Sequence, residues 1–410
     1  MKDILAVILA GGEGSRLFPL TRDRAKAAVP FGGRYRIIDF VLNSFINSGF
    51  YQIKVLTQFK SGSLNTHLAR AWRMSELIGH YVDPVPAQMR MGKHWYRGTA
   101  DAVYQNLALI LHEKPDYVCI FGADHIYTMD IRQMLEFHIA RRSEITVAAL
   151  AVPIEETSAF GVIEVGPDGR MTGYQEKPAD PRPLPHDPSK ALASMGNYIF
   201  NRATLMEELE QNASEDSSHD LAKDILPKAY QTRAIYVYDF SQNAIPGMSE
   251  IERGYWRDVG TIDAYWEANM DLISASPRLN LYNPQWPIRS LSRQYLPPAK
   301  FIFTGQVCHR MGITTDSLVS EGCIIGGGRI DRSILFPQVQ IDSYAYVSES
   351  ILMDGVCVGQ HARIRRAVID KRVRIPSGMK IGYDLEEDRR RFTVSEGGIV
   401  VIPKEWSWNE

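Results

Sequence analysis

Residues 5–17, LAVILAGGEGSRL, are the stretch around which the rest of this chain is organised. The run Ile4–Leu9 is fully apolar and of strand length, which predicts a strand buried on both faces of a sheet. Gly11, Gly12 and Gly14 follow, and they permit positive φ and close approach, so that several N–H groups can converge on phosphate oxygens. Their spacing matches neither the dinucleotide fingerprint nor a P-loop. By itself, the stretch is compatible with a phosphate cradle or with an ordinary strand-to-helix turn.

The first half of the chain alternates apolar runs of strand length with stretches of helical spacing. We expect strands at 4–9, 52–58, 117–121 and 145–152, and helices at 36–46, 64–77, 98–113 and 131–142. This alternation predicts an α/β domain, Rossmann-like, with a mostly parallel sheet covered on both faces. Ligands bind beyond the carboxyl ends of the strands in such sheets, where the glycine loop, Gln58 and Asp124 fall.

Two carboxylates are candidates for a metal site. Asp124 follows a predicted strand in FGADHIY (121–127), and Asp258 lies in YWRDVGT (255–261). Mg²⁺ prefers one or two carboxylates with waters and substrate phosphates. Taken without context, however, Asp124 is more simply explained as a helix cap and His125 as a surface residue. Phosphoryl-type transfer needs positioning and charge neutralisation rather than a protein nucleophile, and the sequence shows no Ser/His/Asp or Cys/His catalytic set.

The last quarter of the chain has an internal period of 17 residues. Aliphatic residues are separated by 6, 6 and 5 positions and predict three short strands per coil of a parallel β-helix, with one side chain from each strand pointing inward. They are Leu318, Ile324, Ile330, Leu335, Ile341, Val347, Leu352, Val358, Ile364, Ile369, Ile375 and Ile381. Such helices often belong to acyltransferases, but no surplus of His and basic residues supports that use. We expect a role in assembly and regulation.

Length and composition bound the remaining possibilities. A chain of 410 residues is too long to form one compact core. The proline-rich stretch 282–298 indicates a linker packed on the first domain. We therefore expect a first domain at 1–276, a linker at 277–299 and a last domain at 300–410. The net charge of −2 argues against nucleic-acid binding, and no apolar run approaches the ~20 residues that span a bilayer. The first strand begins after three residues, which leaves no room for a signal peptide. Together with cysteines that indicate reduced thiols (Cys119, Cys308, Cys323 and Cys357), this predicts a cytoplasmic protein.

The longer string Gly11–Lys26, GGEGSRLFPLTRDRAK, resembles the signature of the sugar-nucleotide pyrophosphorylases, a family of nucleotidyltransferases. The resemblance implies that the glycine loop (Leu9, Ala10, Gly11, Gly12 and Gly14) holds a nucleoside triphosphate. It also implies catalytic roles for Arg16 and Lys26 at the phosphates and for Asp124, with Asp124 and Asp258 as Mg²⁺ ligands. The first domain would then be catalytic, and the β-helix left-handed.

Further strings resemble the branch of that family that makes ADP-glucose from ATP and α-D-glucose 1-phosphate. They are WYRGTADAV (95–103), FGVI (160–163), EKP (176–178), ASMGNY (193–198) and residues 255–261. The resemblance implies that Gln58, Gly98, Thr99 and Asp101 bind nucleotide, and that glucose 1-phosphate contacts Tyr96, Gly161, Glu176, Lys177 and Ser194. Gln58 and Trp95 would link a regulatory site to the substrates, and Arg34 would belong to that site. The chain departs from the family pattern at Glu13, Ala27, Arg34 and Ala123, and Arg34 leaves the activator's identity in doubt.

On this resemblance we expect transfer of AMP from ATP to glucose 1-phosphate with release of pyrophosphate, supplying glucosyl units for glycogen synthesis. We also expect a homotetramer, activated by a sugar phosphate or pyruvate-type metabolite and inhibited by AMP, ADP or phosphate. Two alternatives remain open. The donor is UTP or dTTP in the first, and the chain is a non-catalytic regulatory subunit in the second.

Overall fold

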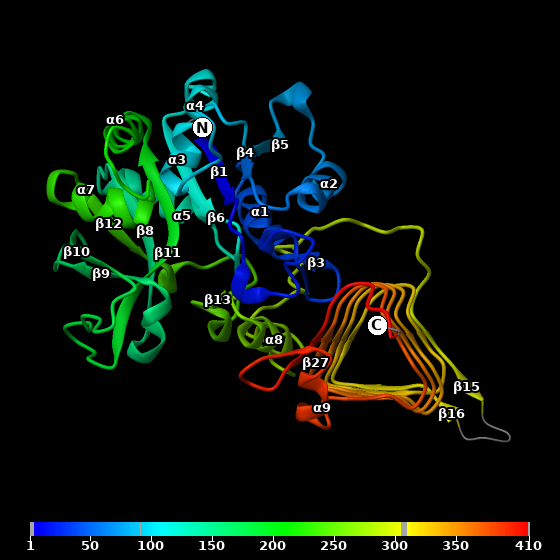
Figure 1. Cartoon of the computed structure of the whole chain (residues 1–410). Helices are drawn as coiled ribbons and strands as arrows, with labels where there is room; N and C mark the ends of the chain where they lie inside the picture. Colours follow the sequence, from blue (N-terminus) through cyan, green and yellow to red (C-terminus); the bar gives the residue numbers. More distant parts are fainter. Residues whose placement is uncertain (1–3, 91, 305–309, 409–410) are drawn as a thin grey trace.

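The first domain is built on a nine-stranded sheet that contains β1. The computed structural model describes residues 4–90, 92–304 and 310–408. Strands run in the order β10-β9-β11-β6-β1-β4-β5, with β8 beside β11 and β12 beside β8 (Figure 1). They are β1 (Ile4–Ala10), β4 (Gln52–Thr57), β5 (Tyr81–Pro86), β6 (Tyr117–Gly122), β8 (Ile145–Pro153), β9 (Gly161–Val165), β10 (Met171–Glu176), β11 (Lys190–Asn201) and β12 (Ile235–Asp239). β6, β1, β4 and β5 are parallel, which confirms the α/β class, while β11 is antiparallel to β6 and β8.

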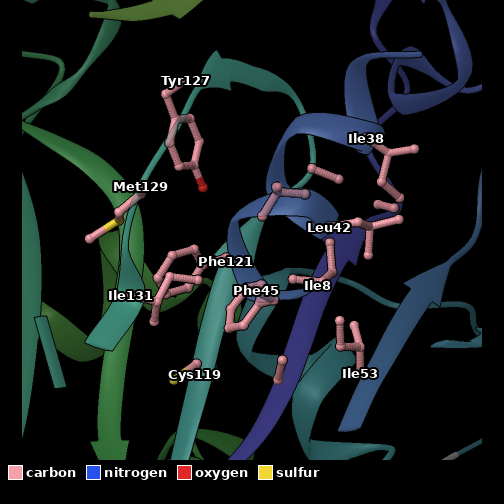
Figure 2. Packing of buried hydrophobic residues seen from close by; sticks show 14 of the residues in the cluster. Ile8, Ile38, Leu42, Phe45, Ile53, Cys119, Phe121, Tyr127, Met129 and Ile131 are labelled. Carbon is pink, nitrogen blue, oxygen red and sulfur yellow. The ribbon is translucent and has the colours of Figure 1, made fainter. Parts of the chain in front are cut away.

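Helices cover both faces of this sheet, as the unbroken apolar character of β1 predicted. Ala6 and Ile8 face a core that includes α1, α2 and α5, whereas Leu5 and Val7 face a core that includes α3, α4, α6 and α7. Figure 2 shows the first of these cores, where the rings of Phe45 and Phe121 meet edge to face at 4.9 Å. The helices are α1 (Ile37–Asn47), α2 (Gly62–Ala71), α3 (Thr99–Tyr104), α4 (Leu107–Glu113), α5 (Ile131–Ala140), α6 (Arg202–Ala213), α7 (Leu226–Thr232), α8 (Ile262–Asp271) and α9 (Leu385–Arg389).

Two predicted helices are wrong in extent, and a polar side chain makes a hydrogen bond at each point where the helix ends early. The helix expected at 64–77 ends after Ala71, where the indole of Trp72 is turned inward to donate to the buried Asp39 carboxylate at 2.8 Å. The helix expected at 98–113 is divided into α3 and α4. At the break, the Asn106 amide donates to the carbonyl of Ala102 and to the hydroxyl of Tyr96, both at 2.8 Å.

The C-terminal region is a parallel β-helix of three sheets, consistent with the predicted left-handed form (Figure 1). Ten of the twelve predicted interior positions are at most 3% exposed. Its strands are β14 (Lys300–Phe301), β17 (Ile313–Thr315), β18 (Leu318–Val319), β19 (Ile324–Ile325), β20 (Arg329–Asp331), β21 (Ile334–Leu335), β22 (Gln340–Ile341), β23 (Tyr346–Ser348), β24 (Ile351–Leu352), β25 (Cys357–Val358), β26 (Arg363–Arg365), β27 (Ala367–Ile369), β28 (Arg374–Ile375), β29 (Lys380–Ile381) and β31 (Val400–Ile402). Short flanking strands are β15 (Phe303–Thr304), β16 (Arg310–Met311) and β30 (Thr393–Val394).

The other two interior positions are wrong by one residue. Ile324 pairs with Gln340 and is 38% exposed, and Ile325 takes the interior place beside Ile341. Leu318 likewise pairs with Ile334, which faces the first domain. The reason is a shorter first coil, since Ile325 and Ile341 are 16 positions apart whereas later partners are 17 apart, and a one-residue slip reverses which side chains point inward.

The β-helix packs on the first domain through the outer face of one sheet. Ile334, Ile351 and Val368 share a buried core with Phe31 and Tyr265. The guanidinium of Arg24 donates two hydrogen bonds, of 3.0 and 3.1 Å, to the buried carboxylate of Asp370. These contacts fix the β-helix against the segment that carries Lys26.

The stretch 277–299 lies against α1. Asn43 exchanges two 2.8 Å hydrogen bonds with the backbone of Arg289, and Asn47 donates to the carbonyl of Pro287. The expected domain limits at 276 and 299 stay a prediction. Cys119, Cys323 and Cys357 are free thiols, and Cys308 lies outside the described residues. Within the described ranges, no helix has both the length and the apolar character to cross a membrane.

Candidate active site

The glycine loop at the end of β1 forms one wall of a cavity of about 620 Å³. Gly14 has φ +66°, and a Cβ there would lie 3.0 Å from Cβ of Lys26 and 3.1 Å from Cγ2 of Thr21. Thr21 donates from Oγ1 to the carbonyl of Gly14 at 2.9 Å and so fixes the turn. The glycine is therefore required both for its backbone conformation and for its close approach to Lys26.

Lys26 lies in a 3₁₀ turn, Lys26–Ala28, and its side chain is mostly buried at the edge of the cavity. Nζ lies 3.0 Å from Oδ2 of Asp124 and 3.0 Å from Oδ1 of Asp258. Burial acts to lower the pKa of Lys26, but the two carboxylates outweigh it and raise that pKa above its ordinary value. Burial likewise acts to raise the pKa of Asp124, and Lys26 with His125 holds it well below its usual range. Lys26 and Asp124 are therefore both charged at neutral pH.

Two short strands bring the carboxylates together. β7 (His125–Tyr127) pairs antiparallel with β13 (Trp256–Asp258), which places Asp258 opposite His125. One potential ligand atom from each of Asp124, His125 and Asp258 lies within 4.8 Å of the others. The imidazole Nδ1 of His125 is buried without a hydrogen-bond partner, and its ring meets Trp256 edge to face. Two carboxylates beside a phosphate-sized loop fit a divalent metal ion.

Arg16 extends from the glycine loop over the same group. Its side chain is 61% exposed, and Nη2 lies 3.9 Å from Oδ2 of Asp258. A Cβ at Gly260 would lie 3.0 Å from Nη2 of Arg16 and 2.9 Å from Oδ2 of Asp258, so that the glycine makes room for this contact. An exposed guanidinium that has only a long contact to a carboxylate is free to turn toward a phosphate.

The opposite wall is formed by the segment before α3. The Gln58 carboxamide accepts from the backbone N–H of Tyr96 at 2.7 Å and donates to its carbonyl at 3.3 Å. This pair holds the strand end of β4 against residues 96–99. All predicted nucleotide-binding residues except Asp101 line the cavity: Leu9, Ala10, Gly11, Gly12, Gly14, Gln58, Gly98 and Thr99.

Glu176, Lys177 and Tyr96, three residues that the resemblance assigns to glucose 1-phosphate, also line the cavity. Lys177 has φ +46°, and its backbone N–H donates to the carbonyl of Phe160 at 3.1 Å. Its Nζ is 3.8 Å from Oε1 of Glu176 and half exposed, so that the ammonium is available to an anion. Oε2 of Glu176 accepts from the hydroxyl of Tyr174 at 2.8 Å, which orients the carboxylate.

Several predicted site residues lie outside the cavity lining, and their roles stay predictions. Asp101 is 3% exposed and accepts from the N–H of Arg97 and from the Gln105 amide, which ties the segment before α3 to the first turn of that helix. Gly161 lies under Tyr174, where a Cβ would be 2.0 Å from the hydroxyl oxygen. Ser194 is buried behind Gly196 and accepts from its N–H. Trp95 is 52% exposed, and Arg34 lies between the domains, 3.8 Å from Glu321.

The structure also places at the cavity residues that the sequence reasoning missed. They are Ser15, Arg97, His125, Met195, Gly196, Tyr198, Asp220, Leu221 and Lys223. One signal could have identified Asp220, because an acidic residue that precedes an apolar helical run predicts an N-cap. Nothing local indicates that this cap faces the nucleotide loop.

Comparisons with known proteins agree with this architecture. The Nucleotidyl transferase family model matches residues 5–275, and the GlmU-like, C-terminal hexapeptide model matches residues 297–402. The glucose-1-phosphate adenylyltransferase of Anaeromyxobacter sp. (strain Fw109-5) is 55% identical over 406 residues, which are 98% of each chain. Those of Anaeromyxobacter dehalogenans and Photobacterium profundum are 56% and 52% identical, again over 98% of each chain. With these similarities over nearly its whole length, the chain belongs to the glucose-1-phosphate adenylyltransferase family.

Proposed function

We propose that this chain transfers the adenylyl group of ATP to α-D-glucose 1-phosphate, with ADP-glucose and pyrophosphate as products. The observation that carries the proposal is the meeting of the glycine loop, Lys26 and two carboxylates at a cavity that Lys177 and Glu176 also line. Relatives named for this reaction align with the whole arrangement.

In the proposed reaction, an oxygen of the sugar phosphate attacks the α-phosphorus of ATP in line. The new P–O bond forms as the bond from the α-phosphorus to the bridging oxygen breaks, and pyrophosphate leaves with the electron pair. Arg16 and Lys26 neutralise the negative charge of the leaving group. The Lys177 ammonium binds the sugar phosphate, and Glu176 accepts from a sugar hydroxyl. The backbone N–H groups of residues 11–14 hold the triphosphate.

Mg²⁺ is the proposed metal. Asp124 and Asp258 would hold it, and when bound it neutralises and orients the phosphate oxygens. Lys26 is hydrogen-bonded to both carboxylates in the structure, so a metal ion held there would compete with its ammonium. The protein itself contributes no covalent intermediate to this scheme.

Regulation and assembly are finer proposals. A narrow cleft between the domains is lined by Arg34, Arg36, Arg293 and Lys371, together with Asp354, which pairs with Arg293 and Lys371. The excess of positive charge would attract an anionic effector such as a sugar phosphate or pyruvate-type activator, or an AMP, ADP or phosphate-type inhibitor. Gln58 and Trp95 would carry its effect to the substrates. We further propose a catalytic domain at 1–276, a packed linker at 277–299, a β-helix at 300–410 for assembly and regulation, a cytoplasmic homotetramer, and a role in glycogen synthesis.

The test is pyrophosphate release by the purified chain with Mg²⁺ and glucose 1-phosphate, with ATP, UTP and dTTP compared. Selective release with ATP is the expected result. Equal or greater release with UTP or dTTP would overturn the adenylyl donor. If no pyrophosphate is released with any of the three nucleotides, even after addition of fructose 6-phosphate, fructose 1,6-bisphosphate or pyruvate, the result would favour a regulatory subunit. Arg16, Lys26, Asp124 and Lys177 line one cavity, and Asp258 is hydrogen-bonded to Lys26 beside it, which speaks against that last outcome.

A further inference from the structure

The two halves of the cavity are joined directly at one place, where the start of α3 meets the start of a π-helix, Leu221–Ile225. The carbonyl of His219 accepts from the N–H groups of Ala100 at 2.8 Å and Asp101 at 3.2 Å. Gly98 lies so close that a Cβ there would be 2.3 Å from the same oxygen. The segment on the nucleotide side and the segment that precedes the π-helix are therefore in backbone contact.

Thr99 connects these segments through its side chain. Its hydroxyl donates to Oδ2 of Asp220 at 3.0 Å and accepts from the N–H of Leu221 at 2.8 Å. The other carboxylate oxygen of Asp220, Oδ1, accepts from the N–H groups of Ala222 at 2.9 Å and Lys223 at 3.1 Å. Three of these bonds, from Thr99, Ala222 and Lys223, hold the Asp220 carboxylate, and the bond from Leu221 holds the Thr99 hydroxyl.

Asp220 belongs to the sugar end of the cavity. It lines the cavity wall with Tyr198 and Glu176, and its charge contributes to the raised pKa values of Tyr174 and Tyr198, after burial as the main cause. Thr99 lines the same cavity from the nucleotide side. One hydrogen bond thus spans the two predicted substrate regions, and a π-helical turn next to it is a feature frequent at functional sites.

We propose that Thr99 is a positioning residue that couples the two substrates: nucleotide bound against the start of α3 holds Thr99, and Thr99 holds Asp220 in the orientation that accepts a sugar hydroxyl. This rests on the proposed function, since it presupposes that nucleotide and sugar phosphate occupy the two ends. The coupling is reciprocal, so each substrate raises the affinity for the other by the same factor.

The test is the dissociation constant of glucose 1-phosphate, measured by titration calorimetry with Mg²⁺, without and with α,β-methylene-ATP, whose carbon bridge blocks transfer. We compare the wild type with Thr99→Val, which keeps the shape and removes the hydroxyl, and with Thr99→Ser, which keeps the hydroxyl. Thr66→Val on the exposed side of α2, where the hydroxyl only donates to the carbonyl of Gly62, is the matched control.

We expect the analogue to tighten glucose 1-phosphate binding in the wild type, in Thr66→Val and in Thr99→Ser. In Thr99→Val the coupling factor falls toward one, because a hydrogen bond to a charged group is worth about tenfold or more in affinity. In steady-state assays with the other substrate saturating, the KM values for glucose 1-phosphate and for ATP then both rise, by up to about tenfold, because the coupling is reciprocal. Thermal unfolding of each variant checks that the fold is kept.

An unchanged coupling factor in a folded Thr99→Val protein overturns the positioning role. An equal loss of the coupling factor in Thr99→Ser also overturns the positioning role of the hydroxyl, because packing of the Thr99 methyl group would then be the cause. Wild-type turnover separates this from the proposed function. An active wild type with unchanged coupling in Thr99→Val removes only the role of Thr99, whereas a wild type that neither binds glucose 1-phosphate nor releases pyrophosphate removes both.

Discussion

Lys26 donates a hydrogen bond of 3.0 Å from Nζ to Oδ1 of Asp258, although 232 positions separate the two residues in the chain. The same ammonium lies 3.0 Å from Oδ2 of Asp124. A cation of the protein therefore holds the two carboxylates that are proposed to bind a metal. This one cation offsets part of the negative charge of the two carboxylates, so a metal ion that binds them has to compete with the Lys26 ammonium.

Replacement of Lys26 by Met should strengthen metal binding in the substrate-free protein. The variant removes both a competing hydrogen-bond donor and a repelling charge, so the affinity for Mn²⁺, measured by electron paramagnetic resonance of the free ion, should rise about tenfold. Turnover should fall at the same time, because the leaving pyrophosphate loses its cation. Lys228→Met, which only breaks an exposed pair with Glu215, is the control. Unchanged or weaker Mn²⁺ binding in Lys26→Met would show that Lys26 does not compete with the metal.

Replacement of Asp124 by Asn should depress turnover by a factor on the order of 10² to 10³, with the fold intact, because a charged metal ligand is lost. Turnover with ATP and glucose 1-phosphate measures the loss of activity, and circular dichroism checks that the fold is intact. Asp168→Asn, in an exposed turn where the carboxylate accepts from the N–H of Arg170, should leave turnover near the wild-type value. Near-wild-type turnover in Asp124→Asn would falsify the metal-ligand role.

Asp354 should make stability depend on acid pH. Burial acts to raise its pKa, but Lys371, at 3.0 Å, and Arg293 outweigh it and lower the pKa. Because the folded-state pKa is depressed, the contribution to stability is fully present above about pH 4 and is lost as the pH falls through the folded-state pKa. Urea unfolding between pH 2.5 and 7 should therefore show a smaller loss of stability with acid in Asp354→Asn than in the wild type. Parallel pH profiles for the two proteins would contradict this assignment.

Arg24 should matter far more to stability than its neighbour Arg22. Its pair with Asp370 is buried between the domains, and Arg24→Met leaves a buried carboxylate without its partner, which costs about 3–5 kcal/mol. Arg22→Met removes an exposed contact to Asp23 and a bond to the carbonyl of Lys404, and should cost under about 1 kcal/mol. Denaturant unfolding compares the two. Similar values for both variants would mean that the pair contributes little to the docking of the β-helix.

The interior of the β-helix offers a comparison between two isoleucines. Ile364 is fully buried in the stack, and Ile364→Ala should lower the free energy of unfolding by about 2–5 kcal/mol. Ile324 points outward, so Ile324→Ala should change it by about 0.5 kcal/mol or less. The 17-residue period alone predicts equal effects, so denaturant unfolding of the two variants checks the corrected register. A large loss of unfolding free energy in Ile324→Ala would instead support the register predicted from the 17-residue period, in which Ile324 points inward.

Structural features that depend on a few consecutive residues could be predicted from the sequence. The apolar run of β1 determines a strand buried on both faces, and the glycines after it determine a close-approach loop, because strand burial and φ preference act over a few residues. The 17-residue period similarly predicted ten interior positions of the β-helix. The errors arose where an interaction with another side chain or a neighbouring segment competed with the local pattern. The predicted helix at 64–77 ends where the Trp72 indole donates to Asp39. The predicted helix at 98–113 is divided where the Asn106 amide donates to Ala102 and Tyr96.

By itself, the sequence indicated most of the segments that become strands, helices and coils, and it named candidate residues for phosphate and metal chemistry. Only the tertiary structure decided which of those residues meet. Lys26 reaches Asp124 and Asp258, Thr99 reaches Asp220, and the buried carboxylate of Asp101 accepts from the backbone N–H of Arg97. The physical reason is that local propensity fixes the backbone over one or two turns, whereas a hydrogen bond between residues far apart in the chain depends on how whole elements pack.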